Sequence, residues 1–193
     1  MTTRTIAVVV LAGTVVAACG STSITASPSG ITSGTPTSAA PTDYTGLLLQ
    51  GGDVSSEPPN VFTPADPPVQ NPNAAPGAAV VFKNSDDSSR IGDTVLVLTD
   101  AGAATNAMSA SVASLGNTVT DGDAQPISVG DGGTMVSGTS PDKTQGVTVL
   151  LFTEGRAFVT LEFDGAPGDV VPADYALGVA RRQDGAVKAR LPG

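Results

Sequence analysis

Residues Ala157–Phe163 alternate between two sides, one of which carries only apolar side chains. Alternation with a period of two predicts a half-buried β-strand. An apolar run, Val147–Phe152, comes just before this stretch, and residues 153–156 between them form a good hairpin turn because Gly155 can take a positive φ angle. Shorter apolar runs bounded by turn residues predict further strands at 77–84, 94–99 and 127–136, with a loop at 85–93.

Two other stretches carry apolar residues at the helical spacing of three to four. Asp100–Leu115 predicts one helix, which Thr99 or Asp100 can cap at its start. Pro172 suits the start of a second helix that runs to about Leu191. The order of elements predicts an α+β fold, an antiparallel sheet of about five strands with two helices packed on one face. The inner stripe of the second helix is expected to hold Ala176, Ala180, Gln183, Val187 and Leu191.

The N-terminal residues have the layout of a secretory signal peptide. Arg4 and the amino terminus make a short positive region, and Ile6–Val16 is an uncharged and mostly apolar run. A run of this length rises only about 16 Å as a helix, which is too short for a bilayer core of about 30 Å. We therefore expect residues 1–18 to direct export without remaining as a membrane span.

The single cysteine of the chain follows this run directly. Val16-Ala17-Ala18-Cys19 resembles a bacterial lipobox, in which an apolar residue and two small residues precede a modified cysteine. The resemblance implies a diacylglyceryl group on the Cys19 sulfur, cleavage just before Cys19, and acylation of the new amine. Several acyl chains anchor a protein stably, so the implied partner is the plasma membrane, with the protein on its extracytoplasmic side. The alternative is a plain signal peptide in which Cys19 has no role.

Two irregular zones separate Cys19 from the expected folded domain. Residues 19–42 are rich in Ser and Thr and carry no charge, so they bury little and are expected to form a flexible linker. Residues 43–76 form a Pro-rich strap. Its apolar run Leu47–Leu49 is expected to pack on the chain's own core, with partner binding as the alternative. Residues 77–193 are the expected α+β globular domain, which should fold without the strap.

Composition and spacing argue against several classes of site. The chain has no histidine, which removes His-dependent nucleophiles and His-bound zinc, and its net charge of -9 argues against nucleic acid as a partner. Ser140 and Lys143 have the SxxK spacing of β-lactamases, but Pro141-Asp142 favours a turn and the partner motifs are missing. The acidic loops at 85–89, 121–123 and 130–133 do not have EF-hand spacing. We therefore expect no metal, no cofactor and no catalytic residue.

Three stretches of the domain carry a second resemblance: Val129–Gly138, the hairpin Val147–Phe163 and the final helix Tyr175–Leu191. They resemble the small α+β domains of actinobacterial, especially mycobacterial, lipoproteins, and the extracellular sensor domains of some mycobacterial Ser/Thr kinases. The kinase sensors often carry disulfides, whereas this chain has one cysteine. The resemblance implies a non-enzymatic cell-envelope lipoprotein that binds a ligand or a protein partner. The alternative is a lipid or glycolipid carrier, which would need an apolar cavity between sheet and helices.

Overall fold

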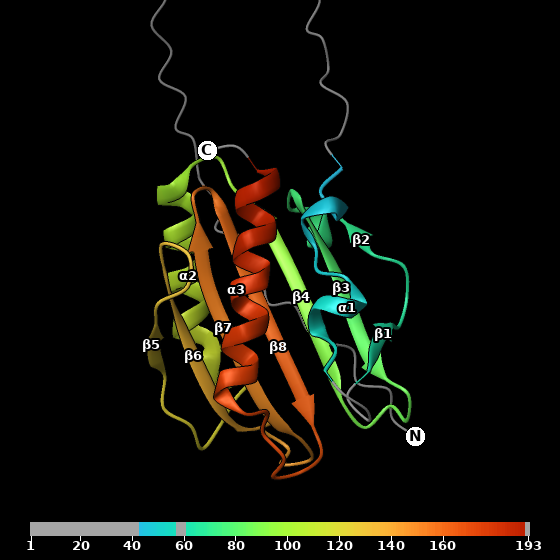
Figure 1. Cartoon of the computed structure of the whole chain (residues 1–193). Helices are drawn as coiled ribbons and strands as arrows, with labels where there is room; N and C mark the ends of the chain where they lie inside the picture. Colours follow the sequence, from blue (N-terminus) through green and yellow to red (C-terminus); the bar gives the residue numbers. More distant parts are fainter. Residues whose placement is uncertain (1–42, 57–60, 192–193) are drawn as a thin grey trace, which may run out of the picture. The chain divides into compact units, whose positions relative to one another are not determined.

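The computed structural model describes residues 43–56 and 61–191. Within these residues, eight strands form one antiparallel sheet (Figure 1). The strands lie in the order β1-β3-β4-β8-β7-β6-β5, and β2 also pairs with β3. Their bounds are Phe62–Pro64 (β1), Val69–Gln70 (β2), Gly77–Asn84 (β3), Arg90–Val97 (β4), Gln125–Ile127 (β5), Gly132–Thr139 (β6), Gly146–Glu154 (β7) and Ala157–Gly165 (β8).

The predicted hairpin is the β7–β8 pair, in which Leu150 lies opposite Leu161. Its turn contains Gly155 at a φ of 52°, as the sequence predicts. On its other side β8 pairs with β4 along the whole length of that strand. This pairing places the centre of the sheet between segments that are far apart in the sequence.

Two long helices cover opposite faces of the sheet, α2 (Ala101–Ser114) on one and α3 (Ala173–Arg190) on the other (Figure 1). The prediction that both helices pack on one face is therefore wrong. The reason lies in β7, which is apolar on both sides. Leu150 and Phe152 pack in the core under α3, whereas Val149 and Leu151 pack in a second core with residues of α2. A strand that is apolar on both faces has to be covered on both.

The local signals for the two helices are confirmed. The Asp100 side chain caps α2, because its Oδ1 accepts a hydrogen bond from the Ala103 N–H at 2.8 Å. Pro172 directly precedes α3. Leu191, the last residue of the predicted inner stripe, is half-buried. The other predicted residues of the stripe are fully buried, and Val179 joins them: Ala176, Ala180, Gln183 and Val187.

The α+β class is right, but the sheet is larger than the about five strands expected. Strand β4 begins at Arg90, so the last four residues of the predicted loop at 85–93 belong to the sheet. The single strand predicted at 127–136 is two strands in the structure, because Ile127 ends β5 and β6 begins at Gly132. The short strands β1 and β2 were not predicted, since a strand of two or three residues is too short to show a period in sequence.

The residues before β3 form small elements that pack on the sheet. A 3₁₀ turn, Thr45–Leu47 (η1), precedes the single-turn helix α1 (Gly51–Val54), and a second 3₁₀ turn, Pro72–Ala74 (η2), precedes β3. Leu47, Leu48 and Leu49 are buried in the core under α3. The apolar run thus packs on its own domain. Within the described part of the chain, no helix is long and apolar enough to cross a membrane.

Candidate functional site

The stretch Gly46–Val54, here called the Leu-rich segment, lies between α3 and the sheet. Local hydrogen bonds shape it. Asp43 Oδ1 accepts hydrogen bonds from the Thr45 N–H and hydroxyl at 2.9 and 2.7 Å, which fixes the entry to η1. The Asp53 carboxylate accepts a hydrogen bond from the Gln50 N–H at 2.8 Å, which closes the start of α1. Between these two turns, Leu47–Leu49 point into the core.

Four side chains of α3 donate hydrogen bonds to backbone carbonyls of this segment. The donors lie at positions 175, 182, 183 and 190. Positions seven or eight residues apart are two helical turns apart, so the four donors lie along one side of the helix. Because successive donors along α3 reach earlier residues of the segment, the two run antiparallel. The bonds join Tyr175 Oη to Val54 O, Arg182 Nη1 to Asp53 O (3.1 Å), Gln183 Nε2 to Leu47 O (2.9 Å) and Arg190 Nη1 to Gly46 O (2.7 Å).

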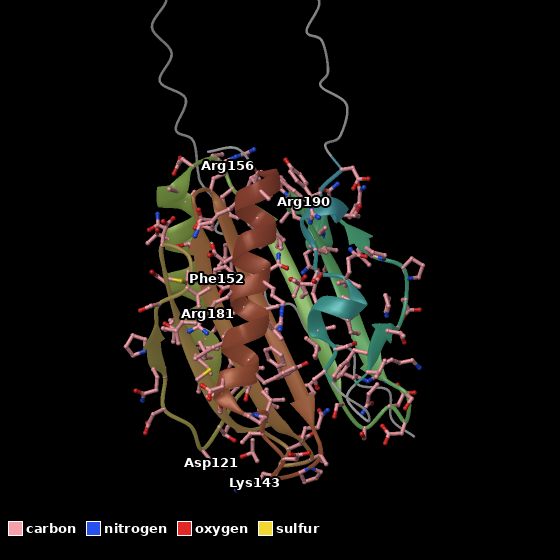
Figure 2. The ribbon with its side chains drawn as sticks, in the orientation of Figure 1. Asp121, Lys143, Phe152, Arg156, Arg181 and Arg190 are labelled. Carbon is pink, nitrogen blue, oxygen red and sulfur yellow. The ribbon has the colours of Figure 1, made fainter. Side chains whose placement is uncertain are left out.

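Figure 2 shows how two of the α3 arginines differ. Arg190 lies at the C-terminal end of α3, beside the start of the Leu-rich segment, where its guanidinium bonds the Gly46 carbonyl. Arg181 is exposed on another side of the helix. Arg182 and Arg190 contact the segment because they lie on the side of α3 that faces it. Arg181 is adjacent to Arg182 in sequence but lies on another side.

The sheet contributes a fifth bond, from Asp93 of β4. Its Oδ2 accepts a hydrogen bond from the Leu49 N–H at 2.9 Å, and the side chain is fully buried. The neighbours of Asp93 across the strands are the apolar Val80 and Leu161. Burial raises the pKa of the Asp93 carboxyl to about 7, and the bond from Leu49 opposes this rise without cancelling it. Asp93, Tyr175, Arg182, Gln183 and Arg190 are called the clamp below.

Two atoms of the clamp are buried without a hydrogen-bond partner among the described residues. They are Asp93 Oδ1 and Gln183 Oε1. Both side chains are fully buried, and each uses its other polar atom to hold the backbone of Leu47–Leu49. Both unpaired atoms are acceptors when Asp93 is ionised. When Asp93 is neutral, its carboxyl carries a proton and can also donate.

Tyr175 anchors the far end of the segment as a neutral donor. Its ring packs edge-on against Phe163, with ring centroids 6.0 Å apart and an interplanar angle of 73°. Burial raises the pKa of the Tyr175 hydroxyl to about 12. The hydroxyl therefore keeps its proton over the whole physiological range and donates it to the Val54 carbonyl.

The site residues predicted from sequence, Val16, Ala17, Ala18 and Cys19, lie outside the described residues. Ser140 and Lys143, which have the SxxK spacing, lie in the turn between β6 and β7. Ser140 Oγ donates to Asp142 Oδ1 at 2.6 Å and accepts from the N–H of Gln145, between β6 and β7. Among residues 43–56 and 61–191, no group of three or more His, Cys, Asp or Glu side chains could hold a metal ion.

The sequence contained a signal for Asp93 that the predicted loop at 85–93 concealed. Ile91, Asp93, Val95 and Val97 occupy alternate positions and point to the same face of β4. An unbroken alternation from Ile91 onward would have placed an acid in the core. Gln183 was expected on the inner stripe of α3. Its bond to the Leu47 carbonyl is a tertiary contact, which the periodicity of the helix does not reveal.

Comparisons with known proteins support the fold. No protein-family model matches the chain. No curated protein matches its sequence. Among solved structures, it is similar to the extracellular domain of PknH from Mycobacterium tuberculosis, with a TM-score of 0.53 and 14% sequence identity. The match covers 77% of this chain and 98% of that one. At this identity the likeness shows a shared α+β fold, in agreement with the resemblance to mycobacterial kinase sensor domains.

Proposed function

We propose that this protein is a lipid-anchored lipoprotein of the cell envelope whose α+β domain is a non-enzymatic accessory module. The module would bind a ligand or a protein partner on the extracytoplasmic side of the plasma membrane. The lipobox-like Val16–Cys19 supports the anchor, and the likeness to an extracellular domain is consistent with the location. The acidic net charge of -9 speaks against nucleic acid as the partner.

The structural observation that carries this proposal is the clamp. The linker that follows Cys19 leads directly into the Leu-rich segment, so the point where a tether would join the domain is bonded to the core. Five side chains hold the backbone of that segment, and three of its leucines are buried. The clamp thus keeps the residues that follow the linker folded onto the domain, so that a tether would begin at the domain's surface.

Several polar side chains that could have carried chemistry have structural roles in the domain, which argues against catalysis at these positions. Ser140 and Asp142 stabilise a turn, and Asp93 holds the backbone of Leu49. Asp131 Oδ2 accepts the Gly155 N–H at 2.8 Å and so supports the β7–β8 turn. These four side chains thus have structural roles that account for their positions.

Mass spectrometry of the protein extracted from its host membrane tests the anchor. The wild type should begin at Cys19 and carry the mass of two or three acyl chains. Cys19→Ala should lack that mass and should be either left uncleaved or released from the membrane. Ser21→Ala, which leaves all four lipobox positions intact, serves as the matched control and should behave as the wild type.

Two results would overturn the proposal: a wild-type protein without acyl mass, or membrane retention of a cleaved Cys19→Ala at the wild-type level. A native spectrum of the same extract tests the binding role. A non-covalently bound lipid would move the function to the carrier class, whereas a co-purifying protein would support the accessory module.

A further inference from the structure

Two buried polar side chains from different elements meet at one short stretch of backbone. Asp93 of β4 holds the Leu49 N–H, and Gln183 of α3 holds the Leu47 carbonyl, both at 2.9 Å. Each leaves one acceptor atom without a partner among the described residues. Leu47–Leu49 are buried together with the two side chains that hold their backbone. When the segment leaves the core, the side chains of Asp93 and Gln183 therefore become exposed to water.

We propose that the clamp is a proton-controlled latch, in which Asp93 and Gln183 hold the Leu-rich segment firmly while Asp93 is protonated and loosely once it is ionised. The latch is internal to the domain, so it does not rest on lipid anchoring. It goes beyond the proposed function, because it makes the attachment of the Leu-rich segment to the domain depend on pH. The ionised carboxylate favours opening because opening brings water to Oδ1.

Within residues 43–56 and 61–191, no positive charge beside Asp93 offsets its ionisation. Burial and the Leu49 N–H are the influences on its pKa, which lies near 7. The charged residues of β3, β4 and β8, such as Lys83 and Glu162, alternate onto the opposite face. Asp174 and Arg181 of α3 are exposed. The other titratable and charged residues of α3 and of the Leu-rich segment, and Asp43 just before the segment, have contacts other than Asp93: Asp43, Asp53, Tyr175, Arg182, Asp184, Lys188 and Arg190.

The direction of the pH effect follows from the two pKa values. With the segment closed, Asp93 has a pKa of about 7. With the segment open, water restores the pKa to about 4. Between these values, the closed form holds a proton that the open form releases. The opening constant therefore rises by up to about tenfold per pH unit from pH 4 to 7 and then levels off. The latch is tightest in acid.

Hydrogen exchange of the Leu49 amide tests the latch, because that N–H bonds Asp93 directly. The protein is the full chain in a Cys19→Ala background, measured from pH 5 to 8 and corrected for the intrinsic exchange rate. Protection of Leu49 in the reference protein should fall by several-fold to tenfold per unit between pH 5 and 7. In Asp93→Asn, which keeps an acceptor for Leu49 but has no proton to lose, protection should be independent of pH.

Asp86→Asn is the control, since Asp86 is exposed in the β3–β4 turn and its Oδ1 accepts from Ser88. Its Leu49 protection should follow the reference profile. Equal pH dependence in Asp93→Asn and the reference protein would overturn the latch, as would a flat reference profile. If Asp93→Asn does not fold, carboxyl NMR titration of the reference protein decides. A midpoint near 7 supports the latch, and one near 4 overturns it.

Discussion

Asp93 occupies a position where the sheet otherwise buries apolar side chains. Ile91 and Val95 flank it on the same face of β4, and both are buried. An ionised carboxylate in such surroundings is costly unless a cation or several donors compensate it. Asp93 has one donor, the Leu49 N–H. The raised pKa of about 7 is the expected consequence, and it makes the stability of the fold depend on pH.

The pH dependence gives a prediction for Asp93→Asn. Unfolding returns the Asp93 pKa to about 4, so the folded state binds one more proton than the unfolded state between pH 4 and 7. The contribution of Asp93 to stability therefore falls as the pH rises through this window. Asparagine resembles the neutral acid. Asp93→Asn should match the wild type below pH 4 and exceed it by up to about 4 kcal/mol at pH 8, because the two pKa values differ by about three units.

Denaturant unfolding of both proteins at several pH values measures this difference. Comparing the two proteins at each pH removes the contributions of the other carboxylates. A variant less stable than the wild type at pH 8 would show that the carboxylate is compensated by a group that the packing does not reveal.

At the scale of elements, sequence periodicity predicted what depends on neighbours in the chain. The β7–β8 hairpin, the Asp100 cap of α2 and the buried stripe of α3 follow from local spacing. The placement of α2 and α3 on opposite faces depends on how β4, β7 and β8 assemble, which local spacing does not fix. The clamp was missed for the same reason, because Asp93 and Gln183 meet the segment across 44 and 136 residues of sequence. The lipobox prediction at Cys19 stays a prediction.

The side-chain contacts of α3 predict unequal roles for its neighbouring arginines. Arg182→Gln and Arg190→Gln each remove a hydrogen bond to a carbonyl of the Leu-rich segment. A bond of this kind contributes about 0.5–1.5 kcal/mol, so exchange of the segment amides should become roughly two- to tenfold faster. Arg181→Gln, next to Arg182 but on another side of α3, removes none of the hydrogen bonds of the clamp and should leave exchange unchanged. Peptide-level hydrogen exchange makes the comparison, and equal effects of all three substitutions would contradict it.

At the scale of the whole molecule, the residues before β3 complete the core. They supply β1 and β2, which pair with β3, and they bury three leucines under α3. Full burial of a leucine contributes about 1.5–3 kcal/mol, so the three together rival the net stability of a small domain. The folded unit in the structure therefore begins before Gly77, where the sequence first shows a strand.

Truncation tests this boundary. A chain of residues 77–193 would expose the core under α3 and leave Asp93 and Gln183 without the backbone groups they bond. It should lose its cooperative melting transition. A chain of residues 43–193, which keeps every described element, should melt cooperatively. Circular dichroism melting curves of the two chains decide, and a cooperative transition in the shorter one would restore the boundary at Gly77.

The antiparallel course of the Leu-rich segment along α3 also has a mechanical consequence. A pull on the chain from its N-terminal side reaches the Arg190–Gly46 bond first, then the bonds of Leu47 and Leu49, and last those of Asp53 and Val54. Bonds loaded one after another yield at lower force than bonds loaded together. The segment would then peel away and pay out about 30 Å of chain while the pairing of β3, β4, β7 and β8 stays intact. The clamp would thus let the N-terminal end of the domain extend under load before the central sheet itself bears the force.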